Sequence, residues 1–345
     1  MDQSPDAQHQ ASKWDWQRAM IALRVALFAG GLWALHRELG GLTPAALLHR
    51  LGQYGWKHVT LGLAGVVVSF LLLGGIELLA LRTSGGSAAR VPSRAALGTA
   101  FVAHAVSQSV GVALLTGTAV RLRTYARRGL GRAQVAQVSA AITLTVTLGL
   151  FSAASWAFLG ESAPIEIAGH VLAVRLIGVL SGLTVAGYVA WSLAGRGAAL
   201  SSRRWRIARP TPLVASAQVA LSTADWLATA AVLYAFMPSG LGLGIWGFLR
   251  IYMIAQTAGM LSHVPAGAGV FELVLIGLLM TASPGADRTA LLAAIVMYRA
   301  TYYLVPLVVA LVVAGAAELR RANHGAHRVL STPLGESRTL VIDAR

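Results

Sequence analysis

The sequence predicts an all-α polytopic membrane protein, with about six full spans and two re-entrant helical hairpins arranged as an inverted repeat. Three observations predict this fold class. Apolar residues make up 56% of the 345 residues and charged residues only 12%, whereas soluble domains are about one quarter charged. Apolar segments of about twenty residues, long enough to cross a bilayer, recur from Arg18 to Glu318. Polar residues within these segments recur at a fixed spacing.

Basic residues are concentrated in short connections and tails. The net charge is +15, and arginines and lysines cluster near the N-terminus and in 121–132, 196–209 and 320–328. This distribution follows the positive-inside rule and leaves no basic soluble face for nucleic acid. We therefore expect a multi-pass protein of the cell (cytoplasmic or inner) membrane, with cytoplasmic N- and C-termini and no nucleic-acid partner.

Several kinds of site are excluded by residue content. Cysteine is absent, which removes disulfides, thiolate metal sites and cysteine nucleophiles. The chain also lacks a nucleophile triad, a metal-ligand cluster and a dinucleotide fingerprint. We therefore expect no catalytic residue, no metal and no cofactor. Residues 1–17 are predicted to form a cytoplasmic tail, 18–317 a single membrane domain, and 318–345 a basic cytoplasmic tail.

The first half of the membrane domain, 18–160, is expected to begin with a span at about 19–35. An amphipathic helix at 43–54 has apolar residues at helical spacing and is expected to lie at the membrane interface. The elements that follow are a span at about 59–81, an apolar stretch at 95–115 that polar residues interrupt, a cluster of five arginines, and a span at about 135–159.

The second half, 168–317, repeats this order. Its expected elements are spans at about 171–194 and 213–237, two apolar segments at 245–264 and 270–281 that flank a Pro-Ala-Gly-Ala-Gly turn, and a last span at about 290–316.

The basic connections indicate which segments do not cross. If 82–94, 121–132 and 196–209 all lie in the cytoplasm, the stretch 95–120 must enter the membrane and return to the same side. By the same argument, 245–281 must dip in from the opposite side. Irregular backbone at that depth is tolerated only where protein or a water-filled cavity covers it. The sequence therefore predicts a shared internal chamber at the hairpins.

Polar markers recur in the same order in both halves. Carboxylates and amides are costly in apolar segments and are usually functional, and a repeated pair of them indicates a duplicated transporter fold with one midplane site. The matches are Glu77 with Asp225, Gln108 with Gln256 and Gly111 with Gly259 at 148 residues, Gly117 with Gly267 and Val120 with Val270 at 150, and Arg24 with Arg175 at 151.

The stretch 262–272, SHVPAGAGVFE, is the most specific local signal. Pro265 is expected to break one half-helix, while Gly267 and Gly269 allow left-handed backbone and close approach. The N–H groups of the next half-helix then either face a lipid phosphate or belong to a simple packing kink. Glu272 could cap these N–H groups, pair with Arg299 or bind a cationic headgroup.

The remaining candidates lie at the hairpins or inside spans. Arg299 either pairs internally or forks onto a phosphate, and tyrosines including Tyr302 flank it. The intramembrane charges Glu77 and Asp225 could pair with Arg24 and Arg175, form a proton path or contact a cationic lipid. Further candidates are the amides Gln108 and Gln256, the arginines Arg121 and Arg123 as phosphate ligands or topology signals, and His104 and His263 as proton relays or satisfied polar residues.

Three stretches carry a family resemblance: 115–125 (LTGTAVRLRTY), 262–272, and 298–303 (YRATYY). They resemble the transmembrane region of lysylphosphatidylglycerol synthases, also called multiple peptide resistance factors, and the stand-alone flippase-like proteins of that superfamily. The resemblance implies a flippase for an aminoacylated or otherwise modified phospholipid. Ala266 and Ala268 stand at positions where the family usually has glycine. The family's soluble aminoacyl-transferase domain has no counterpart here, so lipid aminoacylation by this chain is not expected.

We therefore expect an integral membrane flippase or transporter that moves a phospholipid-type lipid, aminoacylated and glycosylated lipids included, between leaflets of the cytoplasmic membrane. The alternatives are a membrane-embedded headgroup transferase and a non-catalytic subunit of a lipid-modifying complex. The expected partner is a membrane phospholipid or modified lipid; a separate lipid-modifying enzyme and a second copy of the chain are further candidates. The cargo, the direction of movement and the energy source are left open by the sequence.

Overall fold

The computed structural model describes residues 44–110, 113–160, 165–167, 170–172, 174–194, 200–202, 205–207, 209–262 and 264–316. The predicted tails 1–17 and 318–345, the predicted span 19–35 with Arg24, and the candidates Gly111 and His263 lie outside the described residues.

The apolar segments form helices throughout the described part of the chain, which confirms the all-α class. The first half contains α2 (Pro44–Gly52), α3 (Trp56–Ser84), α4 (Gly86–Ala89), α5 (Ser93–Val110), α6 (Ala113–Ala126) and α7 (Arg132–Gly160). The second half contains α8 (Val174–Leu193), α9 (Pro212–Tyr234), α10 (Ile245–Leu261), the 3₁₀ turn η1 (Pro265–Gly267), α11 (Val270–Ala282), α12 (Arg288–Arg299) and the π-helical turn η2 (Ala300–Leu304), after which helix continues to residue 316.

Two short β-hairpins flank α8, and the sequence did not predict them. β1 (Ile165–Ile167) pairs antiparallel with β2 (His170–Leu172), and β3 (Leu200–Ser202) pairs antiparallel with β4 (Trp205–Ile207). Each strand is three residues long, so no run of alternating residues is long enough to give a periodic signal.

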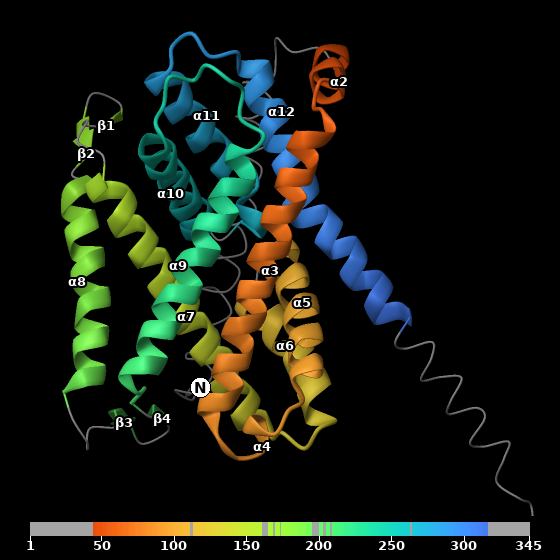
Figure 1. Ribbon diagram of the computed structural model, residues 1–345, viewed down its shortest axis with the longest axis vertical. Coiled ribbons are helices and arrows are strands. Elements are labelled where there is room, and N and C mark those ends of the chain that lie inside the picture. Colours follow the sequence, from red (N-terminus) through yellow and green to blue (C-terminus); the bar gives the residue numbers. More distant parts are fainter. Residues whose placement is uncertain are drawn as a thin grey trace, which may run out of the picture.

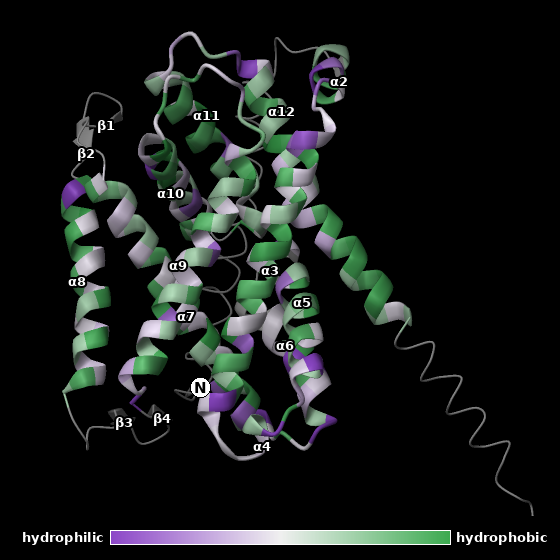
Figure 2. Cartoon of the chain, viewed as in Figure 1, coloured by the Kyte–Doolittle hydropathy of each residue, from purple (hydrophilic) through white to green (hydrophobic). Residues whose placement is uncertain are grey.

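Within the part of the chain that the structure describes, four helices are long and apolar enough to cross a membrane: α3, α7, α8 and the continuous helix Arg288–Ala316. α9 has 23 residues, which corresponds to about 35 Å and also suffices to span the hydrocarbon core. Large apolar side chains point outward along α8, including Leu176, Leu180 and Leu183. Polar residues gather toward the two ends of the bundle, while apolar residues dominate its length (Figure 2). The chain is therefore a multi-pass membrane protein.

The two hairpins enter the bundle from opposite ends. α5 and α6 lie against each other in one half of the molecule, and α10 and α11 lie against each other in the other half (Figure 1). Between them, α3 and α9 pack together at the centre, and η1 at the tip of the second hairpin contacts α5. Re-entrant segments at both predicted places are thus present, whereas the exact division into halves at 18–160 and 168–317 stays a prediction.

The first hairpin extends further than the sequence predicts. The arginine cluster was expected in a connection that begins at residue 121, yet α6 continues to Ala126 and includes Arg121 and Arg123. The reason is an acceptor inside the bundle, because Arg121 forms an ion pair with Glu77 of α3. A paired arginine can remain inside a helix bundle, whereas an unpaired one is driven to the interface.

The α12 helix is anchored at its start and bends in the middle. Asp287 accepts hydrogen bonds from the backbone N–H groups of Thr289 and Ala290 and pairs with Arg50 of α2. Although slight burial raises the pKa of Asp287, these N–H groups and the Arg50 guanidinium outweigh it and hold that pKa below its ordinary value. Further on, the π turn η2 precedes Pro306, which lacks the N–H that a regular helix would need there.

Candidate functional site

A cavity of about 390 Å³ lies where the two hairpins meet the central helices. Its wall comes from both halves of the chain, with α5 and α6 on one side and α10 and η1 on the other. Eight of the repeat markers and candidate site residues from the sequence line this cavity: His104, Gln108, Arg121, Asp225, Gln256, Gly259, Gly267 and Tyr302. The predicted internal chamber is therefore present.

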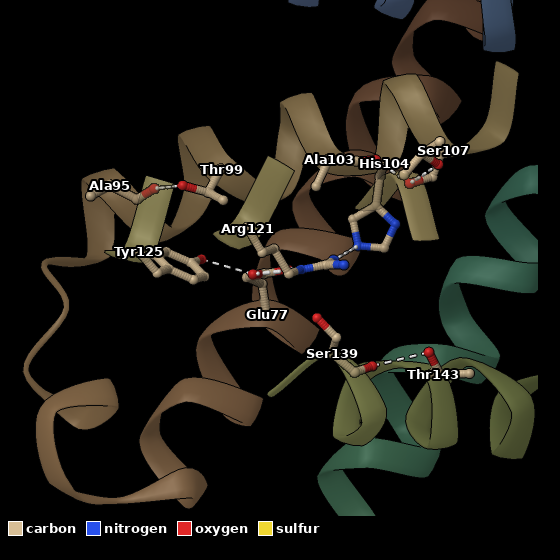
Figure 3. Close-up of polar contacts among 11 residues, drawn as sticks. Glu77, Ala95, Thr99, Ala103, His104, Ser107, Arg121, Tyr125, Ser139 and Thr143 are labelled. Atoms are coloured by element: carbon tan, nitrogen blue, oxygen red, sulfur yellow. Dashed lines mark hydrogen bonds and ion pairs between the residues drawn. The ribbon is translucent and has the colours of Figure 1, made fainter. Parts of the chain in front are cut away.

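Glu77 and Arg121 form a buried ion pair beside the cavity (Figure 3). The Arg121 Nε lies 3.0 and 2.9 Å from the two Glu77 carboxylate oxygens, and Nη2 lies 2.8 Å from Oε2. Tyr125 donates its hydroxyl to Glu77 Oε1 at 2.7 Å, and Glu77 is fully buried. Such a pair neutralises both charges, and the bonds among the described residues leave both N–H groups of Arg121 Nη1 unused.

His104 occupies the other side of the Arg121 guanidinium. Its Nε2 lies 3.2 Å from Arg121 Nη2, as Figure 3 shows. A guanidinium group has only donors, so Nε2 must accept this hydrogen bond and the imidazole must be neutral. The group Glu77, Arg121, His104 and Tyr125 therefore carries no net charge.

Asp225 has a different environment, although it occupies the position equivalent to Glu77. It is 6% exposed and lines the cavity. Within the described residues, its carboxylate accepts one hydrogen bond, from Ser69 Oγ at 2.5 Å, and forms no ion pair. The Tyr302 hydroxyl lies 2.9 Å from Ser69 Oγ and accepts a hydrogen bond from Thr229 Oγ1 at 3.0 Å.

The π turn η2 brings two consecutive tyrosines to the cavity. Tyr302 and Tyr303 both line it, although successive residues of a regular helix point about 100° apart. π turns widen the helix and are frequent at functional sites. Tyr302 also stacks on Tyr298 with the ring centroids 5.6 Å apart, which fixes its hydroxyl between Ser69 and Thr229.

Glu272 and Arg299 bind the backbone at the tip of the second hairpin, on the side that does not face the cavity. Arg299 Nε donates to Glu272 Oε1 at 2.7 Å, and Nη1 donates to the carbonyl oxygen of Ala266 at 2.7 Å. Glu272 Oε2 accepts the N–H of Gly269 at 2.7 Å. Of the roles considered for Glu272, the structure therefore shows two, capping and pairing with Arg299. The Gly269 N–H is thus occupied by this carboxylate, whereas the prediction that N–H groups from Val270 onward face a lipid phosphate stays untested.

The same tip has a strained and closely packed backbone. Ala266 has φ 54°, and Gly267 has φ 62°. This left-handed backbone costs a non-glycine residue about 1–2 kcal/mol. The cost explains why glycine would be favoured at the position that Ala266 occupies. A Cβ on Gly267 would lie 3.1 Å from the Gly259 Cα. The two glycines of the repeat thus allow α10 and η1 to touch.

Several sequence candidates lie away from the cavity. Arg175 is exposed in the first turn of α8 and pairs with neither Glu77 nor Asp225, so the expected pairing is wrong; Arg121 is the partner of Glu77. The intramembrane position of Arg175 stays a prediction. Arg123 is exposed on α6. Gly269, Glu272 and Arg299 support the hairpin tip but do not line the cavity.

Sequence reasoning missed Ser69, Tyr125 and Thr229. Serine and threonine occur throughout the apolar helices and usually bond to the carbonyl four residues earlier, as Thr145 and Thr184 do here. No sequence signal separates the two hydroxyls near Asp225 from these others. Tyr125 follows Arg121 by four residues, which places both on one helix face, and this spacing could have revealed it.

Comparison with known proteins identifies the family. The profile described as lysylphosphatidylglycerol synthase TM region matches residues 21–310. The uncharacterized protein slr0712 of Synechocystis is 30% identical over 292 residues, which cover 81% of this chain and 88% of that protein. The inner membrane protein YbhN of Escherichia coli is 26% identical over 270 residues, or 76% of this chain and 82% of that one.

A shorter match reaches an enzyme. The phosphatidylglycerol lysyltransferase of Staphylococcus epidermidis is 38% identical over 93 residues, which are 27% of this chain and 11% of that protein. The matched profile describes a transmembrane region, and the helices and cavity described above lie almost wholly within its bounds. This chain therefore belongs to the lysylphosphatidylglycerol synthase transmembrane-region family of membrane proteins.

Proposed function

We propose that this protein moves phospholipids between the leaflets of the cytoplasmic membrane, and that the headgroup passes through the cavity between the two hairpins. The observation that carries the proposal is that both hairpins of a membrane protein line one cavity, and that its largely apolar wall carries charged and amide side chains. A charged headgroup meets a large cost in hydrocarbon. Polar groups held at mid-bilayer lower that cost, and hairpins from opposite sides give each leaflet a route to the same place.

The wall offers N–H donors for a phosphate and a carboxylate for an ammonium group. Arg121 lines the cavity with its Nη1 group unused by Glu77 and His104, and arginine binds phosphate well. Asp225 lines the same cavity without a cationic partner among the described residues. A phosphate at Arg121 and an ammonium group at Asp225 would complete both sites.

The size of the cavity matches a headgroup rather than a whole lipid. About 390 Å³ lies near the lower limit of ordinary small-molecule sites. The acyl chains would therefore remain in the bilayer while the headgroup crosses. Lipids of the aminoacyl-phosphatidylglycerol class, with a phosphate and an ammonium group, fit these requirements, and the relative named phosphatidylglycerol lysyltransferase makes them a natural first probe.

Reconstitution tests the proposal. Proteoliposomes would carry fluorescent phosphatidylglycerol, phosphatidylethanolamine or lysyl-phosphatidylglycerol, and a membrane-impermeant reductant would quench only the outer leaflet. We expect the wild-type protein to raise the quenchable fraction of an ammonium-bearing lipid over time, compared with protein-free liposomes. Asp287→Asn, which changes a carboxylate at the start of α12 but outside the cavity, should behave like wild type. If no lipid moves faster than in empty liposomes, the proposal fails.

A further inference from the structure

The wall of the cavity carries a carboxylate whose charge nothing nearby compensates. Among the described residues, the cavity is lined by the charged or imidazole side chains His104, Arg121 and Asp225. Glu77 neutralises Arg121, and His104 accepts from the guanidinium and is therefore neutral. Asp225 is thus the remaining net charge on this wall.

Among the described residues, the helices packed around Asp225 place hydroxyl groups on the cavity wall, whereas their arginines do not line it. α9, which carries Asp225, packs against α3, α7, α8, α10 and α12. The cavity face of α7 bears Thr143 and Thr147, and Tyr188 of α8 bonds to Gln218. Arg250 of α10 is buried but does not line the cavity. The titratable or charged side chains facing the region from these elements are Glu77 from α3, Tyr188 from α8, Tyr252 from α10, and Tyr298, Tyr302 and Tyr303 from α12 and η2.

A buried carboxylate without a counter-charge is too costly to persist, so it must take up a cation or a proton. We infer that Asp225 holds a proton when the cavity is empty and releases it when the ammonium group of a headgroup enters, so that lipid and proton movements are coupled in opposite directions. This inference rests on the proposed function. The carboxylic O–H bond of Asp225 breaks, the proton passes to the solvent, and the carboxylate then pairs with the ammonium group, so the ion pair that forms carries no net charge.

Hydrogen-bond directions around Asp225 fit this exchange. Ser69 donates to Asp225 Oδ1, so Ser69 must in turn accept from Tyr302, whose hydroxyl lies 2.9 Å away. Thr229 has a single hydroxyl proton, which lies within reach of both the Tyr302 hydroxyl and the main-chain oxygen of Asp225. In either case the bond from Ser69 goes to Oδ1, and among the described residues Oδ2 of Asp225 is left for a proton or an ammonium group.

A second observation independently indicates a donor ligand at this place. Gln108 lines the cavity, and its buried Oε1 has no hydrogen-bond partner among the described residues. Its Nε2 lies 3.5 Å from the Tyr302 hydroxyl. An unsatisfied buried acceptor costs about 1–3 kcal/mol, and an N–H of a bound ammonium group would satisfy it. Asp225 and Gln108 thus present two acceptors to one ligand.

Infrared difference spectroscopy detects the proton directly. Protein in phosphatidylglycerol nanodiscs would be loaded with lysyl-phosphatidylglycerol, and the carbonyl band of protonated carboxyl groups would be followed. We expect the wild-type protein to lose a protonated-carboxyl band on loading, whereas further phosphatidylglycerol has no effect. Asp225→Asn should lack that band, Asp225→Glu should shift it, and the control Asp287→Asn should keep it.

Transport with an imposed pH gradient provides the second readout. Acidifying the compartment that the lipid leaves should slow the movement of lysyl-phosphatidylglycerol, and acidifying the compartment that it enters should speed this movement. In Asp225→Asn the rate of movement should not depend on the pH gradient. If the wild-type protein moves lipid but shows neither the loss of the protonated-carboxyl band nor an effect of the pH gradient, the inference is wrong and the proposed function stands.

If the wild-type protein moves no lipid, the proposed function is wrong. A loss of the protonated-carboxyl band on loading would then support only the proton site at Asp225. If Asp225→Asn fails to fold, Asp225→Glu and Tyr302→Phe are compared with the wild-type protein in the same two assays.

Discussion

Glu77 and Asp225 occupy equivalent positions of the two halves, 148 residues apart, yet among the described residues only Glu77 has a cationic partner. Glu77 is fully buried and receives three hydrogen bonds from Arg121 and one from Tyr125. Asp225 lines the cavity and receives one, from Ser69. The difference teaches that duplication can leave one copy of a charge as structure and the other available to a ligand.

The largest difference between the two carboxylates should appear when the ion pair is broken. Arg121→Gln leaves Glu77 buried without a counter-charge, so we expect unfolding to become easier by about 3–5 kcal/mol. Denaturant titration in detergent micelles measures the change. The double variant Glu77→Gln/Arg121→Gln should recover most of the loss, because no uncompensated charge remains. A small loss in Arg121→Gln would show that Glu77 is not held by this pair.

The glycines at the two hairpin tips sharpen the comparison. A Cβ on Gly267 would lie 3.1 Å from the Gly259 Cα, in left-handed backbone, whereas one on Gly117 would meet the Ser107 Oγ at 2.6 Å. The backbone at Gly259 cannot shift away from an added methyl group, whereas the side-chain hydroxyl of Ser107 can rotate away from it. We expect Gly267→Ala to cost about 2–4 kcal/mol and Gly117→Ala about 1 kcal/mol. Equal losses in the same titration would contradict the close packing of α10 on η1.

The strained residue of the second hairpin offers a gain instead of a loss. Ala266 has φ 54°, and glycine adopts this backbone without strain. Because glycine also loses more entropy on folding, we expect Ala266→Gly to stabilise the fold by only about 0.5–1 kcal/mol. Thermal unfolding measures the shift, and Ala268→Gly, two residues later and outside the left-handed region, is the matched control. A loss of stability in Ala266→Gly would argue against strain at this tip.

Asp225 should show the smallest effect on stability. Asparagine has nearly the same shape as a protonated aspartate, and its carbonyl oxygen can still accept from Ser69. We expect Asp225→Asn to change the free energy of unfolding by less than about 1 kcal/mol, while movement of ammonium-bearing lipids no longer responds to an imposed pH gradient. Comparable losses of stability in Asp225→Asn and Arg121→Gln would mean that both carboxylates are structural.

Much of this architecture could be predicted from the sequence, because the signals for helices and connections lie within single segments of the chain. Apolar length predicts the helices, basic connections predict both re-entrant hairpins, and the repeat brings Gln108, Gln256 and Asp225 to one cavity. Which charged side chains pair with each other depends on contacts between segments that are distant in the sequence. Glu77 and Arg121 are 44 residues apart, and the sequence placed Arg121 in a connection, because a topology signal and a buried partner have the same residue type.

Other parts of the site depend on geometry that no residue pattern records. Arg175 matches Arg24 in the repeat but lies exposed at the start of α8, since helix boundaries shift by a few residues. The π turn at Tyr302 has no composition of its own apart from the nearby Pro306. The hydroxyl groups around Asp225 resemble the many serines and threonines that bond within their own helices.

Blocking the cavity tests the central claim most directly, because the wild-type chain has no cysteine. Gln256→Cys places a thiol on the cavity wall, and Leu180→Cys places one on the exposed apolar face of α8. Both variants would be labelled with a bulky polar thiol reagent, the labelling confirmed by mass spectrometry, and lipid movement measured in proteoliposomes. The account predicts that labelled Gln256→Cys stops moving lipid while labelled Leu180→Cys continues. Undiminished movement through a filled cavity would contradict it.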